Sequence, residues 1–565
     1  MNSASSMNLK FMQELESSPE FACLRPLFGW LHSYFRTCPD FLKPCIFYLS
    51  IFPRDHSIRR RRLVRRWIAE GYARDTDKMF AEESGEQFFC GLLDLSIIMQ
   101  KPHSVTTAFS DRRMTLCQVN SFVREYIISR QMEENLVFEL GSSCTLTSQR
   151  TGRHLIIMES WDRDIIVFES IDFSRLRSLT VFGEWRSFFI SDRMRLLRVL
   201  DLEDASGLKD EDLKQMMKLL CRLKYLSLRR CTEICRLPNS LGCSRQLETL
   251  DVRHTSIATM PTTITKLKKL QYLRASTTKP TEEQPIPDAA GTTKPTKKQP
   301  TPHTSVSWTS SLFSRRRQLE CVEVPTGIER MTALLTIGVV NVDSARGRAI
   351  LKEFRKLTQL HKLGVSGISK NNSKDFCVAI SSHAHLESLS VRLKDNQDCL
   401  YVTPDGYLPP QNLQSFKLYG LADKFPEWIN QLDNLRKLVL EMTILTEDQP
   451  RSAVDSGILK YLFYVSLPSS FLMQLRCYET VKVLEISCSS SLDVTFGSQA
   501  LHNLELLKVS CCSGSGSVMK FSGLEKLSEY ELKEVQIKGS HDDKLKKDVE
   551  EQLARHQKKP VLKME

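Results

Sequence analysis

The sequence lacks the long apolar segments and the dense cysteine pattern that mark membrane and secreted proteins. It contains no apolar run of about 18 residues, and its polar start, Met1–Glu20, has no apolar signal core. Its 17 cysteines are scattered over 565 residues instead of being evenly spaced in a small domain. We therefore expect a soluble cytoplasmic protein with no membrane span, in which most cysteines are reduced and buried.

Sequence patterns of common catalytic and metal sites are also missing. The 12 histidines do not form an H-E-x-x-H pattern, and no G-x-S-x-G nucleophile pattern occurs. Two cysteine pairs, Cys231 with Cys235 and Cys511 with Cys512, lack partners at zinc-site spacing. The phosphate-binding pattern G-x-x-x-x-G-K-[ST] occurs nowhere in the chain. These absences predict a protein that is not an enzyme and holds no metal or cofactor of its own.

The composition is that of an ordinary folded protein. Hydrophobic residues make up 41% of the chain and charged residues 26%, which excludes wholesale disorder. The net charge is +12. A mild positive charge spread over so long a chain indicates a solvated surface more than attraction to nucleic acid or membrane.

Leucines recur at a regular interval in the middle of the chain. The pattern L-x-x-L, followed by another apolar residue, is centred on Leu200, Leu226, Leu250 and Leu273, which are 26, 24 and 23 residues apart. This interval is the period of leucine-rich repeats, about 20–29 residues. Because one repeat cannot bury its own leucines, the repeats must stack, and their short strands form a parallel sheet on the concave side of a curved solenoid.

A helical segment precedes the repeats. The apolar run Phe41–Phe52 predicts a buried helix ended by Pro53, and helical spacing continues over Ile58–Tyr72 and Glu82–Leu95. Two short β-prone pieces follow, over residues 97–100 and 114–119. Three helices followed by a hairpin are the elements of a winged helix.

This segment resembles a known family. Leu42–Cys45, Tyr48–Pro53 and Leu63–Tyr72 resemble the winged helix in the NB-ARC module of plant nucleotide-binding, leucine-rich-repeat immune receptors, without a gap over residues 42–72. The resemblance implies a role in plant defence, and ADP and ATP are the switching ligands of the parent family. Since the P-loop pattern is missing, it implies a truncated member with only the winged-helix part of the module.

The resemblance also locates the family's nucleotide-sensing triplet, Met/Val-His-Asp, at Val119, Asn120 and Ser121. Asparagine stands where the family has histidine, and serine stands where it has aspartate. The triplet has therefore lost its imidazole and its carboxylate. We expect it to be degenerate and unable to bind nucleotide independently.

Together these patterns predict an α/β protein, in which a mainly helical winged-helix domain precedes a curved leucine-rich-repeat solenoid with a parallel concave sheet. Thr277–Pro285 recurs as Thr292–Pro300 with nothing apolar to bury, which predicts a disordered insertion. The predicted parts are a truncated helical lead-in (1–36), the winged helix (37–140), a first repeat region (141–275), the insertion (276–318), a second repeat region (319–540) and a charged tail (541–565).

A run of arginines lies in the second predicted helix, at Arg59, Arg60, Arg61, Arg62, Arg65 and Arg66. Three interpretations stay open. The arginines form a solvated face or pair with acidic groups of an adjoining domain, they form a nuclear-import signal, or they bind DNA phosphates as in other winged helices. The apolar stripe of Leu63, Val64 and Trp67 favours the first, because it turns the arginines away from the domain core.

Polar positions of the predicted strands would line the concave face, where they are exposed to a partner. They are Lys224, Ser227, Arg229, Glu248, Thr249, Asp251 and Arg253. Their mixed charges and few aromatic neighbours predict a polar protein partner, such as a pathogen effector, a guarded host protein or a full-length receptor.

The sequence therefore predicts a non-catalytic module of plant defence that acts in protein recognition or autoinhibition. One alternative is an ADP/ATP-dependent switch whose P-loop domain is supplied by another chain. A second is a DNA-binding regulator that uses the arginine helix.

Overall fold

The fold is described from a computed structural model of the chain. The residues described are 25–100 except 78, 116–129, 137–141, 152–277, 321–394, 406–421, 426–442, 481–488, 492–496, 501–511, 519–528, 531–538 and 543–564, with the short pieces 19, 22, 399–400, 404 and 465–466. The predicted insertion, 276–318, lies outside these residues except for its first two.

The first domain is a winged helix. Its helices are α2 (Arg25–Thr37), α3 (Lys43–Tyr48), α4 (Arg60–Glu70), α5 (Ala81–Asp94) and α6 (Ser121–Ser129). A small antiparallel sheet, in the order β1-β3-β2, joins β1 (Ile58–Arg59), β2 (Ile98–Gln100) and β3 (Leu116–Val119). The predicted apolar run gives α3 and a 3-10 turn, η2 (Leu49–Ile51).

Helix α4 is shorter than predicted at both ends. It begins at Arg60 because Ile58 and Arg59 pair with β3 instead. It ends at Gly71, whose φ of 85° is a left-handed conformation that glycine adopts without steric cost. Leu63 and Trp67 lie in the domain core, fully buried, as their spacing predicts.

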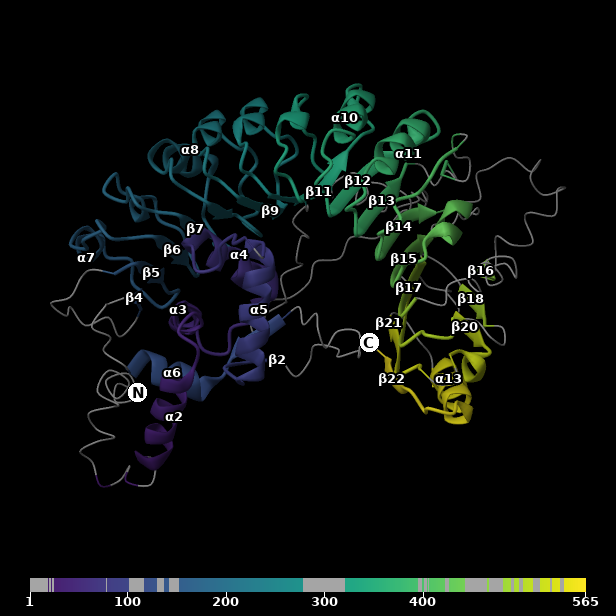
Figure 1. Ribbon diagram of the computed structural model, residues 1–565, viewed down its shortest axis with the longest axis horizontal. Helices are drawn as coiled ribbons and strands as arrows, with labels where there is room; N and C mark the ends of the chain where they lie inside the picture. Colours follow the sequence, from purple (N-terminus) through teal and green to yellow (C-terminus); the bar gives the residue numbers. More distant parts are fainter. Residues whose placement is uncertain are drawn as a thin grey trace, which may run out of the picture.

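The second domain is one continuous parallel sheet of sixteen strands among the residues described. The strands are β4 (Val137–Leu140), β5 (His154–Ile157), β6 (Ser178–Val181), β7 (Val199–Asp201), β8 (Tyr225–Ser227), β9 (Thr249–Thr255), β10 (Tyr272–Thr277), β11 (Thr336–Asn341), β12 (Lys362–Ile368), β13 (Ser388–Leu393), β14 (Ser415–Leu421), β15 (Lys437–Met442), β17 (Val483–Cys488), β19 (Leu506–Cys511), β21 (Glu534–Lys538) and β22 (Val561–Met564). They line the inside of an arc (Figure 1).

Short helices cover the convex side of the arc. The α-helices are α7 (Ile165–Glu169), α8 (Asp210–Leu219), α10 (Gly347–Phe354), α11 (Ser373–Ser381) and α13 (Asp543–Arg555). The other repeats turn back through 3-10 segments, η3 (Ser187–Phe189), η4 (Asn239–Cys243), η5 (Thr262–Lys266), η6 (Ile328–Arg330), η7 (Glu427–Gln431) and η10 (Leu524–Lys526). A small parallel sheet contains β16 (Val465–Ser466), β18 (Leu492–Thr495) and β20 (Met519–Ser522).

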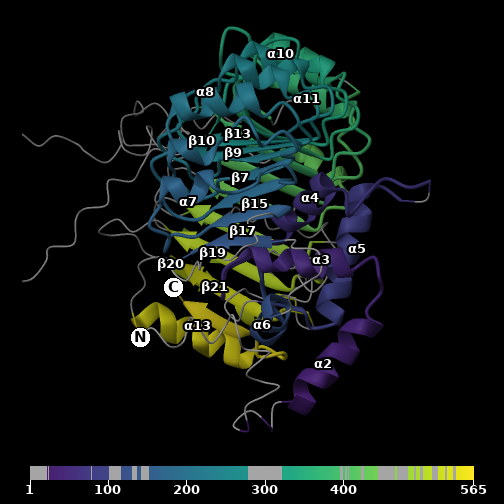
Figure 2. The same cartoon turned by 90° about the vertical axis from the view of Figure 1, so that its left-hand side faces the viewer.

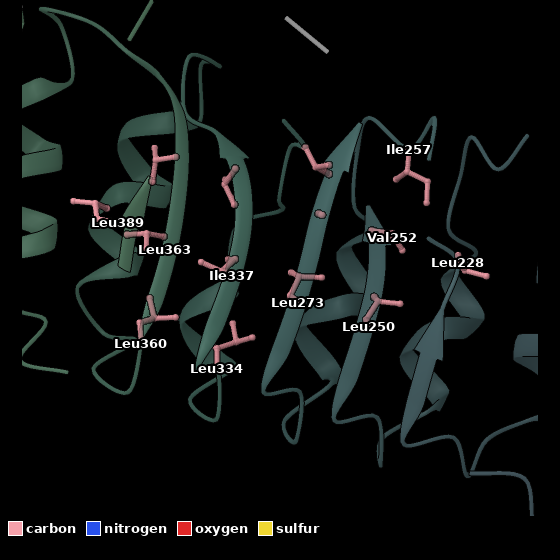
Figure 3. Close-up of a cluster of buried hydrophobic side chains, with 14 of the residues drawn as sticks. Leu228, Leu250, Val252, Ile257, Leu273, Leu334, Ile337, Leu360, Leu363 and Leu389 are labelled. Atoms are coloured by element: carbon pink, nitrogen blue, oxygen red, sulfur yellow. The ribbon is translucent and has the colours of Figure 1, made fainter. Parts of the chain in front are cut away.

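The repeated leucines stack in register between the sheet and this convex layer. Leu226 lies opposite Leu250, Leu250 opposite Leu273, and Leu273 opposite Ile337. All four belong to one buried cluster, and Figure 3 shows the row from Leu228 to Leu389 pointing to the same side of the strands. Burial of a continuous row, not of separate cores, therefore holds the solenoid together.

The predicted architecture, a winged helix followed by a curved repeat solenoid with a parallel concave sheet, is confirmed. The described sheet begins at β4, inside the segment assigned to the winged helix. It also continues past residue 540, because β22 pairs with β21 and Val549 of α13 is fully buried. Residues 543–564 of the charged tail thus form a unit of the solenoid.

The winged helix lies inside the arc and covers only the first part of the concave sheet. Figure 1 shows α3, α4 and α5 within the curve beside the early strands, and Figure 2 shows α4 against the face of the sheet. Helix α4 contacts β7 and β8. Two chain segments far apart in sequence therefore form one interface.

Replacing Leu226 by Ala should destabilise the solenoid by about 2–5 kcal/mol, because the fully buried side chain leaves a cavity in the stack. Urea unfolding followed by circular dichroism measures the change. Leu219→Ala is the matched control, since Leu219 is 38% exposed at the end of α8 and should cost far less. Equal losses for the two variants would contradict the stacked-core account.

Candidate functional site

Two sequence periods bring opposite charges together between the domains. On α4, Arg62 and Arg66 are four residues apart and so share one helical face. On the leucine-rich repeats, Asp201 and Glu203 alternate with the buried Leu200 and Leu202, so they point to the concave side. Docking α4 against β7 therefore places a basic stripe on an acidic one.

The centre of this contact is the carboxylate of Asp201, which two arginines share. Arg66 donates from Nη1 to Asp201 Oδ2 at 2.6 Å, and Arg62 donates from Nε to the same oxygen at 2.8 Å. The Arg66 and Asp201 side chains are fully shielded from solvent, and Arg62 is only 3% exposed. A carboxylate with two charge-assisted hydrogen bonds is the arrangement that a buried charge requires.

The remaining donors of Arg66 tie the winged helix to a second strand. Its Nε donates to the Tyr48 hydroxyl at 2.8 Å, and its Nη2 donates to Thr180 Oγ1 on β6 at 2.7 Å. All three nitrogens of the guanidinium thus have a partner. Arg66 is held in one orientation by both domains.

Glu203 extends the network outward. It pairs with Arg62 at 3.1 Å and with Arg229 at 2.8 Å, and it also accepts a hydrogen bond from Arg59. Three guanidinium groups from two domains surround one carboxylate. Together with Asp201, this set forms what we call the arginine clamp: Arg59, Arg62, Arg66, Asp201, Glu203 and Arg229.

Burial and opposite charge act against each other on the two carboxyl groups. Burial alone would raise the pKa of Asp201, yet Arg62 and Arg66 lower it below its ordinary value, so the group is ionised in the docked state. Burial raises the pKa of Glu203, against Arg62 and with the help of the neighbouring Asp201 charge. The pKa of Arg62 is raised by the two carboxylates, although its burial opposes this.

An ion-pair network of this kind fixes geometry more than it adds stability. Desolvation of buried charges offsets most of their attraction, whereas removing one partner leaves an uncompensated charge that costs about 3–5 kcal/mol. The arrangement is therefore sensitive to disruption. It defines where α4 sits on the sheet and penalises any change that breaks one pair.

Apolar and aromatic contacts surround the arginine clamp. Ala69 of α4 packs with Val199 and Tyr225, and all three are buried. Further along the sheet the Arg65 guanidinium stacks 3.9 Å from the centre of the Tyr272 ring, a cation–π contact. The Tyr272 hydroxyl donates to Glu82 of α5. Together with the contacts of η2 with β4 and β5, the interface between the domains extends from β4 to β10.

A second polar cluster lies at the end of α4. His154 Nδ1 is 3.5 Å from the Glu70 carboxylate and 2.8 Å from Ser178 Oγ, while its Nε2 is 3.1 Å from the Tyr72 hydroxyl. Burial raises the pKa of Glu70 to about 7, against the attraction of Arg66, and lowers the pKa of His154 to about 3. Glu70 in the docked state is therefore protonated below neutral pH and changes its charge near pH 7.

The six predicted arginines divide into three groups. Arg59, Arg62 and Arg66 enter the arginine clamp, and Arg65 stacks on Tyr272. Arg60 pairs with Glu86 inside the winged helix, and Arg61 is half-buried. Of the open interpretations, the geometry corresponds to pairing with acidic groups of an adjoining domain. Arg62, Arg65 and Arg66 are shielded from any DNA backbone while the domains are docked.

The predicted partner-binding residues lie on the concave side, but they are not the exposed surface that was expected. Ser227, Thr249 and Asp251 are buried, Arg253 pairs with Asp251 at 2.6 Å, and Lys224 pairs with Glu248 at 2.7 Å. For Ser227, Thr249 and Asp251 the expectation of exposure was wrong, because the winged helix covers this part of the sheet, whereas Lys224, Arg229, Glu248 and Arg253 are half-buried. Arg229 pairs with Glu203 in the arginine clamp.

The triplet lies at the junction of β3 and α6 and satisfies its own polar groups. Asn120 Oδ1 accepts the Phe122 N–H at 3.0 Å, and Nδ2 donates to the Ser96 carbonyl at 3.3 Å. Val119 is buried, and Ser121 opens α6. The triplet presents no charged side chain, and the Asn120 amide is used within the domain.

Among the residues described, no three His, Cys, Asp or Glu side chains gather in a way that suits a metal ion. In that part of the chain, no helix is both long and apolar enough to cross a bilayer.

Comparison with known families matches both halves of this site. Residues 51–127 match the family described as "Disease resistance protein Winged helix domain", and residues 175–292 and 314–560 match "Leucine-rich repeat region". The chain belongs to the plant disease-resistance family. The resemblance of residues 42–72 is thus confirmed, and the arginine clamp joins the two regions that characterise the family.

Individual disease-resistance proteins are similar over most of the chain. Disease resistance protein Pik-2 of Oryza sativa subsp. japonica is 30% identical over 72% of this chain and 39% of its own length. Disease resistance protein RGA4 of the same organism is 34% identical over 75% of this chain and 39% of its own length. The chain therefore spans about two fifths of these relatives.

Solved structures give a weaker likeness. A leucine-rich-repeat protein of Leptospira interrogans covers 72% of this chain at 16% identity, with a TM-score of 0.34.

Sequence reasoning missed the acidic half of the site. Asp201 and Glu203 lie among the repeat leucines, and the sequence at a strand position does not show which other part of the protein will cover it. A signal was present, since register places Asp201 beside Ser227 and Ser227 beside Asp251, which gives the early strands an acidic row. Such a row opposite a basic helix indicates an interdomain contact.

Stability should depend on pH through Glu70. Its carboxyl pKa rises from an ordinary 4.5 to about 7 in the folded protein, so the folded state binds the proton more tightly than the unfolded chain. This stabilisation is fully present below pH 4.5 and is lost as the pH rises through 7. Relative to Glu70→Gln, the native protein should lose on the order of 3 kcal/mol of unfolding free energy across this range.

Urea unfolding at pH 5 and pH 8 measures this difference. Glu184→Gln is the control, because Glu184 is half-exposed in a surface pair with Arg186 and should show the native pH dependence. Parallel pH profiles for the native protein and Glu70→Gln would show that Glu70 does not titrate in this range.

Proposed function

We propose that this chain is a non-catalytic defence module in which the leucine-rich repeats hold the winged helix in an inactive, docked position. The observation that carries the proposal is the arginine clamp, with Arg62 and Arg66 sharing the buried Asp201. Moving one of these side chains away while the other stays buried leaves a charge that has neither its partner nor water. The docked position is therefore well defined.

The same chemistry makes the docked position releasable. A buried ion pair adds little net stability compared with apolar packing, because both charges regain their hydration when the interface opens. A partner that binds the repeats better in the open state shifts this balance by its difference in affinity. Autoinhibition and recognition are then two states of one interface.

The later strands supply surface for recognition. Beyond β12 the concave side carries Arg392 stacked on Tyr419 at 5.0 Å and the half-exposed pair Lys437 and Glu485 at 3.5 Å. Lys482 and Lys533 flank Glu505 with exposed fractions above 40%. These mixed charges fit a polar protein ligand, such as a pathogen effector or a guarded host protein.

We assign no nucleotide role to the triplet at 119–121, because its amide is used within the domain and it lacks a charge. The switch proposed here works through contacts between protein domains. A nucleotide-dependent step would require groups that the triplet does not offer.

Asp201→Asn should release the winged helix. The substitution keeps the shape of the side chain but leaves two buried guanidinium groups without their anion, at a cost of about 3–5 kcal/mol. Hydrogen exchange of the α4 and β7 amides should accelerate at least tenfold. Glu184→Gln removes an exposed carboxylate on the same domain and should leave the exchange unchanged.

Coupling between the partners gives a stricter test. Arg66→Met with Asp201→Leu should cost less than the sum of the two single substitutions, because the double variant leaves neither charge alone. Full additivity would contradict the shared pair.

Autoinhibition itself is tested in leaves. Transient expression of Asp201→Asn should raise ion leakage above that of the native chain and of Glu184→Gln. If ion leakage is equal for the variants while the α4 amides of Asp201→Asn exchange faster, the docking proposal stands and the autoinhibition proposal is rejected.

A further inference from the structure

A cavity of about 510 Å³ lies at the joint between the two domains, away from the arginine clamp. One wall is formed by the end of α4 and the turn that follows, including Ile68 and Arg74. The other wall is formed by residues just before β7, β8, β9 and β10, including Leu196, Arg198 and Arg222. Neither domain alone encloses this space.

The cavity wall carries more positive than negative charge. Of its two carboxylates, Glu248 pairs with Lys224 at 2.7 Å, whereas Asp75 accepts the Ala81 N–H at 2.8 Å, a neutral donor that leaves its charge in place. The wall thus sets three arginines against the one remaining carboxylate. Arg74 donates to the Gly71 carbonyl at 2.6 Å, and Arg198 reaches the Glu70 carbonyl at 3.4 Å. Carbonyl oxygens carry no net charge, so these contacts do not neutralise the guanidinium groups, although Arg198 also attracts the Glu70 carboxyl group.

Three arginines therefore remain for a ligand. Within the ranges that the structure describes, no carboxylate lies within ion-pair distance of Arg74, Arg198 or Arg222. Arg74 and Arg222 are exposed, and Arg198 is half-buried. Guanidinium groups form paired hydrogen bonds with phosphate and carboxylate oxygens.

An apolar side accompanies these charges. Leu196 is 40% exposed although it is large and apolar, and Ile68 is half-buried beside it in the cavity wall. A small inorganic anion would leave this side bare. A ligand with a charged group and an apolar body would cover both.

We propose that this cavity binds a small organic phosphate monoester, whose phosphate faces Arg198 and Arg222 and whose apolar body lies on Leu196. The volume falls within the range of small-molecule sites, about 300–1,000 Å³. Two negative charges match the excess of guanidinium groups better than one carboxylate does. The inference rests on the docking of the winged helix, because both domains form the walls.

Such a ligand would couple metabolism to the state of the interface. It binds the docked arrangement, in which the cavity exists, and not the separated domains. By linkage it stabilises the docked arrangement. The ligand would therefore stabilise the inactive state.

The test uses phenyl phosphate as the probe and the full chain as the protein. Isothermal titration should show saturable binding at one site per chain. Inorganic phosphate and phenol, which each supply half of the chemistry, should bind at least tenfold more weakly. A phosphotyrosine peptide that binds more than tenfold tighter than phenyl phosphate would overturn the small-molecule assignment in favour of a phosphorylated protein.

Matched variants locate the binding. Arg222→Gln and Arg198→Gln should each weaken phenyl phosphate binding about tenfold. Arg245→Gln should leave it unchanged, since Arg245 is an exposed arginine of the same repeats outside the cavity. Leu196→Ser should weaken phenyl phosphate but not inorganic phosphate, and Leu219→Ser should affect neither.

Hydrogen exchange of α4 separates the two proposals. Slow exchange with no saturable binding overturns the cavity proposal and leaves docking intact. Fast exchange in the native chain contradicts docking, and the cavity proposal fails with it.

Discussion

The position of the winged helix depends on one carboxylate. Asp201 lies on the concave face of β7 without contact to solvent, and both Arg62 and Arg66 end on the same oxygen. A charge in such a place is stable only with its partners in place, so the sheet and the helix constrain one another. The cation–π contact of Arg65 and the Glu70 cluster lie on either side of this point.

The charge pattern of the concave sheet explains why docking occurs at its beginning. Register aligns Thr180, Asp201, Ser227 and Asp251 in a row across β6 to β9, and the next position in that row is Arg274. Acidic and small polar positions thus give way to a basic one. The arginines of α4 are therefore attracted to the early strands. At Arg274 the effect is reversed: burial lowers its pKa most, and the nearby positive charges of Arg65, Arg253 and Arg61 lower it further.

The fold could be predicted from the sequence because it follows from short-range periods. The spacing of Leu226, Leu250 and Leu273 determines both strand position and stacking, and α4 could be located from Leu63 and Trp67. The site could be predicted only in part. The arginine run was visible, but its partners were not, since helical and strand periods say which face is polar and not what meets it. For the same reason, Ser227 and Asp251 were expected to be exposed.

The junction of β10 and β11 carries a further meaning for how this protein can vary. Leu273 and Ile337 are neighbours in the ladder although a long stretch of chain separates them. The entropic cost of closing a longer loop between two paired strands rises only with the logarithm of its length. Segments can therefore be gained or lost at this point while the concave sheet and the convex layer keep their geometry. An insertion at this point therefore need not alter the concave face on which the winged helix lies.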